Sequence, residues 1–100
     1  SIAHRDWIRG FVCCRCGSAT GIEVAHVRLG SGAGMGQKPD DWRTVPLCRE
    51  CHQYQHTIGE ETFWKGHYVE ELIDQFCKAS PRAAQIREAR NRDTQYPPSR

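Results

Sequence analysis

The stretch VPLCRECHQYQH, residues 45–56, decides the fold of this chain. Its apolar, partly β-branched start predicts a short strand, at a sheet edge because proline cannot donate to a ladder. The polar continuation places Cys48 and Cys51 at C-x-x-C spacing and His52 and His56 four residues apart. Side chains four apart share one face of a helix, so the segment predicts a helix that carries two imidazoles on one face. The adjacent cysteine points roughly 100° away around that helix, so one helix could serve two metal sites.

A second C-x-x-C pair, Cys13 and Cys16, lies upstream and is followed by glycine, with 31 residues between Cys16 and Cys48. Zn²⁺ takes four thiolate or imidazole ligands in tetrahedral geometry. The two pairs therefore predict one structural zinc site on Cys13, Cys16, Cys48 and Cys51. Cys14 could replace Cys13 as a ligand, but the Cys-Arg-Cys spacing is too tight for the usual knuckle.

Two other interpretations of the cysteines are open. Two disulfides would suit a secreted chain, but the start of the sequence does not resemble a signal peptide. Residues 48–52 also match the C-x-x-C-H pattern of haem attachment, which would leave the first pair without a role. The sixth cysteine, Cys77, lies in an apolar helical stretch and is expected to be a small core residue.

Composition describes a small domain with a modest core. The chain has 100 residues, a hydrophobic fraction of 38%, six cysteines and five histidines, so something besides apolar burial is expected to stabilise it. No stretch approaches the roughly 20 apolar residues of a membrane span, and no repeat is found. A net charge of +2 is too small to indicate nucleic acid by itself. The initial serine suggests a trimmed or excised chain.

The patterning predicts a mixed order of helices and strands. We expect a helical turn over 4–12, a strand over 22–28, a glycine-rich loop over 30–36, a strand over 44–47, a helix over 49–57, a helical turn over 60–65, an amphipathic helix over 68–79 and a basic helix capped by Ser80. The apolar face of the amphipathic helix is expected to pack on the core, at Val69, Leu72, Ile73 and Phe76. These elements predict a single domain over 1–94, with a core over about 13–57, C-terminal helices over about 60–92 and a disordered tail over 95–100.

The histidines indicate chemistry beyond a zinc scaffold. His52 and His56 could hold a second cation, although a solvated His56 is the simpler alternative. His26 ends the first strand, and alternation places it on the face of Ile22 and Val24. If that face packs on the helix, His26 lies near the histidine pair, where an unliganded imidazole could deprotonate a water. The alternative is a half-buried strand histidine with a hydrogen bond.

These motifs resemble the HNH endonucleases, the ββα-metal or His-Me finger group. The matching segments are the C-x-x-C-G knuckle at 13–17, Ala-His-Val at 25–27 and VPLCRECHxxxH at 45–56. The segment MGQKPDD at 35–41 looks like a subfamily of small phage and prophage HNH proteins. The resemblance covers about residues 4–67.

The resemblance implies an α+β fold, a small zinc-stapled ββα-metal finger with additional C-terminal helices. It implies a metal-dependent DNA endonuclease with His26 as general base and a catalytic divalent ion on His52 and His56, such as Mg²⁺, Mn²⁺, Ni²⁺ or Zn²⁺. The four cysteines would hold the structural Zn²⁺. The implied partner is DNA, with no membrane and no small-molecule cofactor, for a monomer or weak dimer in the cytoplasm of a bacterial or phage-infected cell.

The sequence departs from the family pattern at two positions. Ala25 stands where many members have an Asp or His metal ligand before the base, and Arg43 replaces the middle Asn. Strand alternation turns Glu23 away from His26, which makes it a poor substitute ligand. Asp40 or Asp41 could supply a carboxylate from the loop.

Basic residues are candidates for phosphate contact. Lys38, Arg28 or Arg43 could hold the scissile phosphate, and Arg87 and Arg90 on the last helix could contact DNA, although each could equally be a solvated surface charge. A second function also fits the sequence. A non-catalytic zinc module that binds nucleic acid or protein would explain the missing ligand, whereas it would have no need of three imidazoles.

Overall fold

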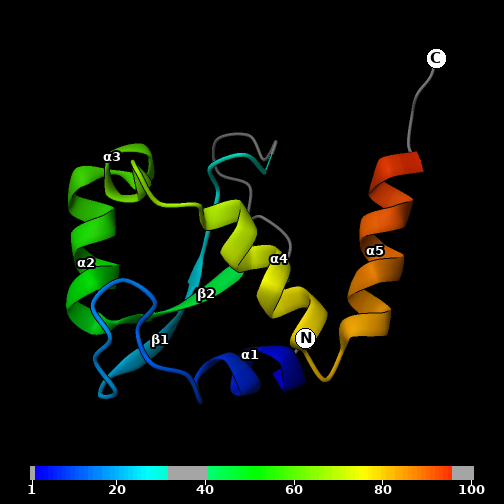
Figure 1. The fold of residues 1–100 in the computed structure, drawn as a ribbon, viewed down its shortest axis with the longest axis horizontal. Coiled ribbons are helices and arrows are strands. Elements are labelled where there is room, and N and C mark those ends of the chain that lie inside the picture. The colour runs from blue at the N-terminus through cyan, green and yellow to red at the C-terminus, as the bar shows by residue number, and fades with distance from the viewer. Residues whose placement is uncertain (1, 32–40, 96–100) are drawn as a thin grey trace.

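The protein has an α+β fold, which confirms the predicted class. The computed structural model describes residues 2–31 and 41–95, without the side chains of 92–95. Lys38, Asp40 and residues 96–100 of the predicted tail lie outside it, whereas Gln95, where that tail was expected to begin, is still helical. In chain order the elements are α1 (Ile2–Ile8), β1 (Ile22–His26), β2 (Thr44–Cys48), α2 (Arg49–Ile58), α3 (Glu60–Trp64), α4 (Val69–Ala79) and α5 (Ala83–Gln95), shown in Figure 1.

The two strands and α2 form the predicted ββα unit. β1 and β2 pair antiparallel, with Ile22 opposite Cys48 and His26 opposite Thr44. α2 follows β2 without a linker, because Cys48 is both the last strand residue and the N-cap, and its side chain accepts a hydrogen bond from the Cys51 amide. Gly59 ends the helix at a φ of 88°, a conformation that suits glycine.

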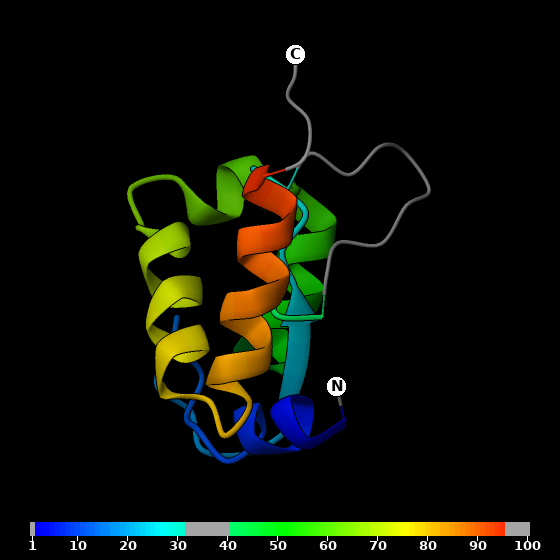
Figure 2. The same cartoon turned by 90° about the vertical axis from the view of Figure 1, so that its right-hand side faces the viewer.

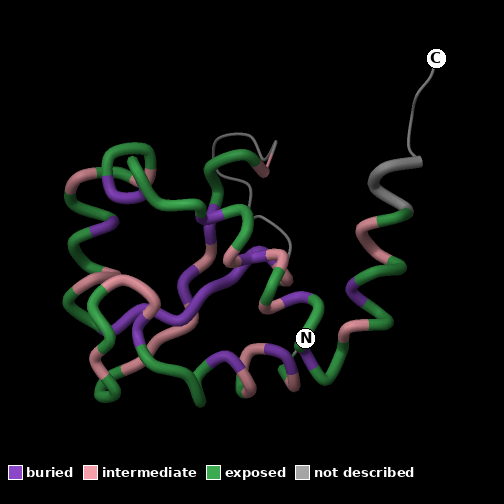
Figure 3. The backbone as a smooth tube through the Cα atoms, in the orientation of Figure 1, coloured by how far each residue is buried: buried purple, intermediate pink, exposed green. Residues whose placement is uncertain are grey.

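The helices surround the sheet on several sides. α2 and α3 lie at one end of the molecule and α5 at the other, with the strands, α4 and α1 between them (Figure 1). Turned by 90°, the molecule shows α4 and α5 side by side and α1 beneath them (Figure 2). The buried residues concentrate along the strands and the inner sides of α3 and α4 (Figure 3).

The side of β1 that packs on α2 is the side of Glu23, so the condition that would bring His26 close to the histidine pair is not met. Ala25 and Val27 are fully buried, whereas Ile22, Val24 and His26 are only partly buried. The small methyl group of Ala25 fits into the core. Glu23, Ala25 and Val27 therefore share the more buried side, and His26 lies on the other.

β1 also ends earlier than expected. The carboxylate of Glu60 accepts the amide hydrogens of Arg28 at 2.9 Å and of Leu29 at 2.8 Å, so these amides bind a side chain instead of a strand. The last ladder-like bond is donated by Val27 N to Arg43 O.

The C-terminal helices pack largely as expected. Val69 and Ile73 are buried, and Leu72 and Phe76 pack against the core from partly exposed positions. Ser80 accepts a hydrogen bond from the Arg82 amide at 3.0 Å, as a capping residue does, although α5 itself begins at Ala83 after a turn. Cys77 is buried, which confirms it as a core residue. None of the described helices is both long and apolar enough to cross a membrane.

Candidate functional site

Four cysteines from the two C-x-x-C pairs converge on one point. The sulfurs of Cys13, Cys16, Cys48 and Cys51 all lie within 4.8 Å of one another, and the Cys16 and Cys48 sulfurs are 3.6 Å apart. Cys14 is not a member of the group, as its spacing predicted. All six cysteines are free thiols, so the disulfide alternative finds no support. The cluster is a site that could hold a metal such as zinc.

Local backbone bonds shape both halves of this cysteine cluster. The Cys16 amide donates to the Cys13 sulfur at 3.5 Å, and the Cys51 amide donates to the Cys48 sulfur at 3.4 Å. In the first half, Gly17 turns the chain at a φ of 80° and its amide donates to Cys13 O. The Cys14 amide donates to Pro46 O, which ties the knuckle to β2. Both C-x-x-C turns therefore form the same amide-to-sulfur hydrogen bond, which directs their sulfurs to one point.

Arg15, between the knuckle cysteines, joins the knuckle to α3. Its guanidinium lies 4.3 Å from the centre of the Phe63 ring and donates to Phe63 O at 2.8 Å. This cation–π and hydrogen-bonded contact holds the N-terminal knuckle against the helix that follows α2. The sequence carried no motif for this pairing.

The electrostatics of the cluster call for a cation. Burial opposes ionisation of Cys13, but hydrogen bonds from the backbone at Cys48, Cys16 and Arg15 outweigh it and lower the pKa of Cys13 to about 6. Burial and the neighbouring thiols raise the pKa of Cys51. Cys13 therefore ionises readily, whereas burial above all, together with the neighbouring thiols, opposes ionisation of Cys51. A divalent cation favours the thiolate forms, and four sulfurs are a donor set that zinc prefers.

A second group lies on the outer face of α2. The His52 and His56 rings are tilted by 36° with their centroids 4.9 Å apart, so the predicted pair shares a face. His52 Nδ1 lies 2.8 Å from a carboxylate oxygen of Glu23, whose other oxygen is 3.5 Å from Arg49 Nε. The hydrogen bond with His52 lowers the pKa of Glu23. Glu23 is turned away from His26, as strand alternation predicted, and contacts His52 because α2 packs on the Glu23 side of β1.

The histidine pair and Glu23 do not converge as the cysteines do. Among the described residues, the four cysteines are the one group of three or more potential ligands whose atoms lie within 4.8 Å of each other. His52 is partly buried and His56 is exposed at the surface. Side-chain rotation would be needed to direct all three at one ion.

His26 lies at the end of β1, beside Asp41. The His26 Nε2 and Asp41 Oδ1 atoms are 3.5 Å apart, and Asp41 also lies 3.9 Å from Arg5. The side chain that contacts His52 is Glu23, on the alternate face. Asp41 is thus placed beside the predicted base instead of beside the histidine pair on α2.

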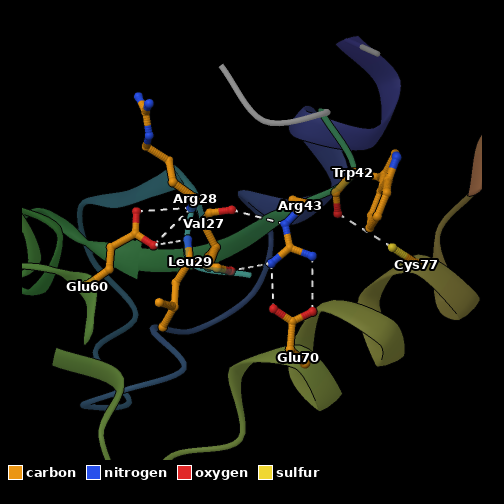
Figure 4. A network of polar contacts seen from close by, with 8 residues as sticks. All are labelled: Val27, Arg28, Leu29, Trp42, Arg43, Glu60, Glu70 and Cys77. Carbon is orange, nitrogen blue, oxygen red and sulfur yellow. Dashed lines mark hydrogen bonds and ion pairs between the residues drawn. The ribbon is translucent and has the colours of Figure 1, made fainter. Parts of the chain in front are cut away.

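Arg43 is part of the framework, which corrects its assignment to phosphate binding. Its side chain is 7% exposed and forms a bidentate pair with Glu70 at 3.0 and 2.5 Å. The remaining donors reach Val27 O at 3.1 Å and Leu29 O at 2.7 Å, as Figure 4 shows. With its donors committed inside the fold, Arg43 connects the segments on both sides of the loop to α4.

The other predicted phosphate contacts divide by exposure. Arg90 is also structural, because it donates to Asp74 at 2.9 Å and lies over the Trp42 ring at 5.0 Å. Its side chain is still 37% exposed, so Arg90 lies at the surface with a structural partner. Arg87 and Arg28 have exposed positions, while Lys38 lies outside the described residues.

Comparison with known proteins gives the chain a family but no activity. A family model described as a protein of unknown function, DUF968, matches residues 1–80. The chain belongs to this family, whose matched region holds both C-x-x-C pairs, all five histidines and α1 to α4. The searches of curated proteins and of solved structures find no match.

Proposed function

We propose that this protein is a metal-dependent DNA endonuclease of the HNH type. The observation that carries the proposal is the histidine pair on α2, whose ring centroids are 4.9 Å apart and which begins one residue after Cys51. A strand carboxylate, Glu23, contacts this pair. A purely structural zinc module has no need of this second group of ligand side chains. The element order β1, β2, α2 supports the proposal because it is the order of a ββα finger.

Each group has a distinct role in this proposal. Cys13, Cys16, Cys48 and Cys51 hold a structural Zn²⁺ that joins the knuckle to α2. His52 and His56 hold the catalytic ion, and Glu23 accepts the second ring N–H of His52 and so fixes its orientation. When bound, a divalent cation such as Mg²⁺, Mn²⁺, Ni²⁺ or Zn²⁺ supplies positive charge for the phosphate and the leaving oxygen.

His26 acts as the general base of the reaction. Its imidazole is about one-third exposed, at 32%, so a water can reach it. A positioned acid–base group typically contributes about 10²–10⁴-fold to a rate. Arg87, Arg28 and Lys38 remain candidate contacts to the DNA backbone.

Plasmid cleavage by the purified protein tests this function. We expect nicking or cleavage of supercoiled DNA with at least one of the four divalent ions and none with EDTA. His26→Ala should lose about 10²–10⁴-fold in rate. His67→Ala is the matched control, because His67 is an exposed histidine in the connection between α3 and α4. No cleavage with any ion, or equal rates for both variants, would overturn the proposal.

A non-catalytic zinc module is the second candidate. Two observations favour it. Ala25 is fully buried where the family resemblance implies a metal ligand, and Glu23, His52 and His56 do not converge on one point. Such a module would bind DNA or protein without cleaving DNA, and His26→Ala would leave that binding unchanged.

A further inference from the structure

The end of β1 carries a side-chain pair that the resemblance does not account for. His26 Nε2 faces Asp41 Oδ1 at 3.5 Å, with side-chain exposures of 32% and 49%. Asp41 lies two residues before the framework residue Arg43, on the segment that leads into β2. The pair therefore spans both ends of the loop between the strands.

The fold fixes the position of Asp41 through the residue opposite His26. Thr44 pairs with His26 in the strand register and is fully buried. Its hydroxyl donates to the Asp41 carbonyl at 3.1 Å, and its oxygen lies 3.3 Å from His4 Nε2. Arg5 lies 3.9 Å from the Asp41 carboxylate. The carboxylate thus stands beside His26 because its backbone is bonded to the strand partner of His26.

We propose that Asp41 is the positioning residue of His26, selecting the ring tautomer in which Nε2 carries the proton. This inference rests on the proposed nuclease function only for its catalytic consequence. A neutral imidazole has one N–H donor and one acceptor nitrogen, and the bond that the donor makes decides which nitrogen is which. A carboxylate accepts but does not donate, so it holds the proton on Nε2 and leaves Nδ1 as the base.

In the proposed hydrolysis, His26 takes up the proton of the attacking water. The water proton moves to Nδ1, and the water oxygen forms a new bond to phosphorus. The ester oxygen leaves with the electron pair of the broken P–O bond and takes a proton from solvent. The resulting imidazolium is stabilised by the Asp41 carboxylate, as a carboxylate stabilises the histidine of hydrolase triads.

This role replaces the expectation that Asp41 is a ligand of the catalytic ion. Glu23 contacts His52, one of the two proposed ligands on α2. His26 and Asp41 meet on the opposite face of β1. An aspartate that positions the base should affect the rate without affecting metal affinity. A ligand would affect both.

Two measurements on the zinc-loaded protein test the proposal. The ¹⁵N shifts of the His26 ring, assigned by comparison with His26→Ala, should show the Nε2–H form in the native protein. In Asp41→Asn, whose amide can also donate, this preference should be lost. Cleavage should fall by about tenfold, the scale of one charge-assisted hydrogen bond at a partly exposed site, with unchanged Mn²⁺ affinity. Asp41→Glu, which keeps the carboxylate, should retain part of the Nε2–H preference of His26 and part of the cleavage rate.

Asp6→Asn is the matched control. Asp6 is an exposed carboxylate on α1 that pairs with Arg9 just after the helix, so its loss should change neither the tautomer nor the rate. An unchanged His26 tautomer in Asp41→Asn would overturn the proposal. A changed tautomer in a protein that cleaves no DNA with any ion would overturn the nuclease function while supporting the pairing. Reduced Mn²⁺ affinity in Asp41→Asn would identify Asp41 as a ligand and also overturn it.

Discussion

At the scale of single residues, the same side-chain type serves opposite purposes according to its partners. Arg43 and Arg90 are bound to carboxylates and carbonyls within the fold, while Arg87 is exposed on α5. The histidines divide in the same way. His4 is 1% exposed between Ser80 and Thr44, whereas His56 is exposed on α2. Residue type alone therefore did not separate framework residues from candidate functional ones.

Replacing Arg43 should destabilise the protein. Arg43→Leu removes the bidentate partner of Glu70 and leaves the carbonyls of Val27 and Leu29 without their donor. We expect the free energy of unfolding to fall by about 2–3 kcal/mol, the scale of losing a buried charged hydrogen-bond donor. Urea denaturation followed by circular dichroism measures it. Arg87→Leu, at an exposed position, should change the free energy of unfolding by less than about 0.5 kcal/mol. Equal losses for both variants would contradict the structural role assigned to Arg43.

The two helical histidines should differ from His26 in their response to metal. His56→Ala removes one proposed ligand, so the catalytic ion should bind more weakly and excess metal should restore part of the cleavage by mass action. His26→Ala should keep native metal affinity and gain nothing from excess metal. Titration with Mn²⁺, followed by cleavage rate and by calorimetry, separates the two. Identical metal dependence would mean that His56 is not a ligand.

At the scale of elements, His4 connects three parts of the chain. Thr44 donates its hydroxyl proton to Asp41 O, so its oxygen accepts from His4 Nε2 and the Ser80 hydroxyl donates to His4 Nδ1. The single neutral side chain thus joins α1, β2 and the turn between α4 and α5. Burial lowers the pKa of His4, because the charged form loses its hydration there.

This shift predicts acid destabilisation. The pKa of His4 in the folded state lies below the usual value of about 6.5 in the unfolded chain, so the unfolded chain takes up the proton first. The contribution of neutral His4 to stability is complete above about pH 6.5 and declines as pH falls toward the folded pKa. Thermal melting between pH 7.5 and 5 should show this slope. His4→Gln should melt at a lower temperature with a shallower slope, whereas His67→Ala should keep the native slope. A native slope in His4→Gln would exclude His4 as its source.

Variants of two arginines on α5 should distinguish contact with DNA from packing of the helix on the rest of the fold. Arg87→Gln should weaken DNA binding and reduce the slope of log K against log salt by about 1, as expected for one lost phosphate contact. Arg90→Gln should act on the fold by releasing Asp74 and the Trp42 ring. Fluorescence anisotropy at several salt concentrations, with melting curves for both variants, distinguishes the effects. An unchanged salt slope in Arg87→Gln would show that α5 does not contact DNA there.

At the scale of the whole molecule, the cysteine cluster joins two segments that are far apart in the sequence. It links the knuckle after α1 to the start of α2, with both strands between them in the sequence. A chain of 100 residues with a modest apolar fraction gains much from such a link. Structural zinc in small domains contributes folding free energy on the order of 10 kcal/mol.

Removing one cluster cysteine should therefore unfold the protein. Cys48→Ser should lose one equivalent of bound zinc and the cooperative thermal transition, since Cys48 also caps α2. Cys14→Ser is the matched control, because Cys14 lies in the knuckle but outside the cluster. Zinc content by atomic absorption and folding by circular dichroism measure both. A folded Cys48→Ser variant with native zinc content would contradict the site.

The sequence by itself determined the α+β class, the order of the elements and the four cysteines of the cluster. These follow from local spacing, because C-x-x-C turns, helical periodicity and helix-ending glycines are written in neighbouring residues. The tertiary structure decided which side of β1 faces α2, and hence that Glu23 contacts His52 and that His26 lies beside Asp41. It also decided that Arg43 is buried within the fold and that Arg90 pairs with Asp74. The physical reason is that side chains alternate along a strand, so an error of one residue moves every side chain to the opposite face. Ala25 is fully buried in the core, although the apolar pattern of β1 favoured the face of Ile22 and Val24.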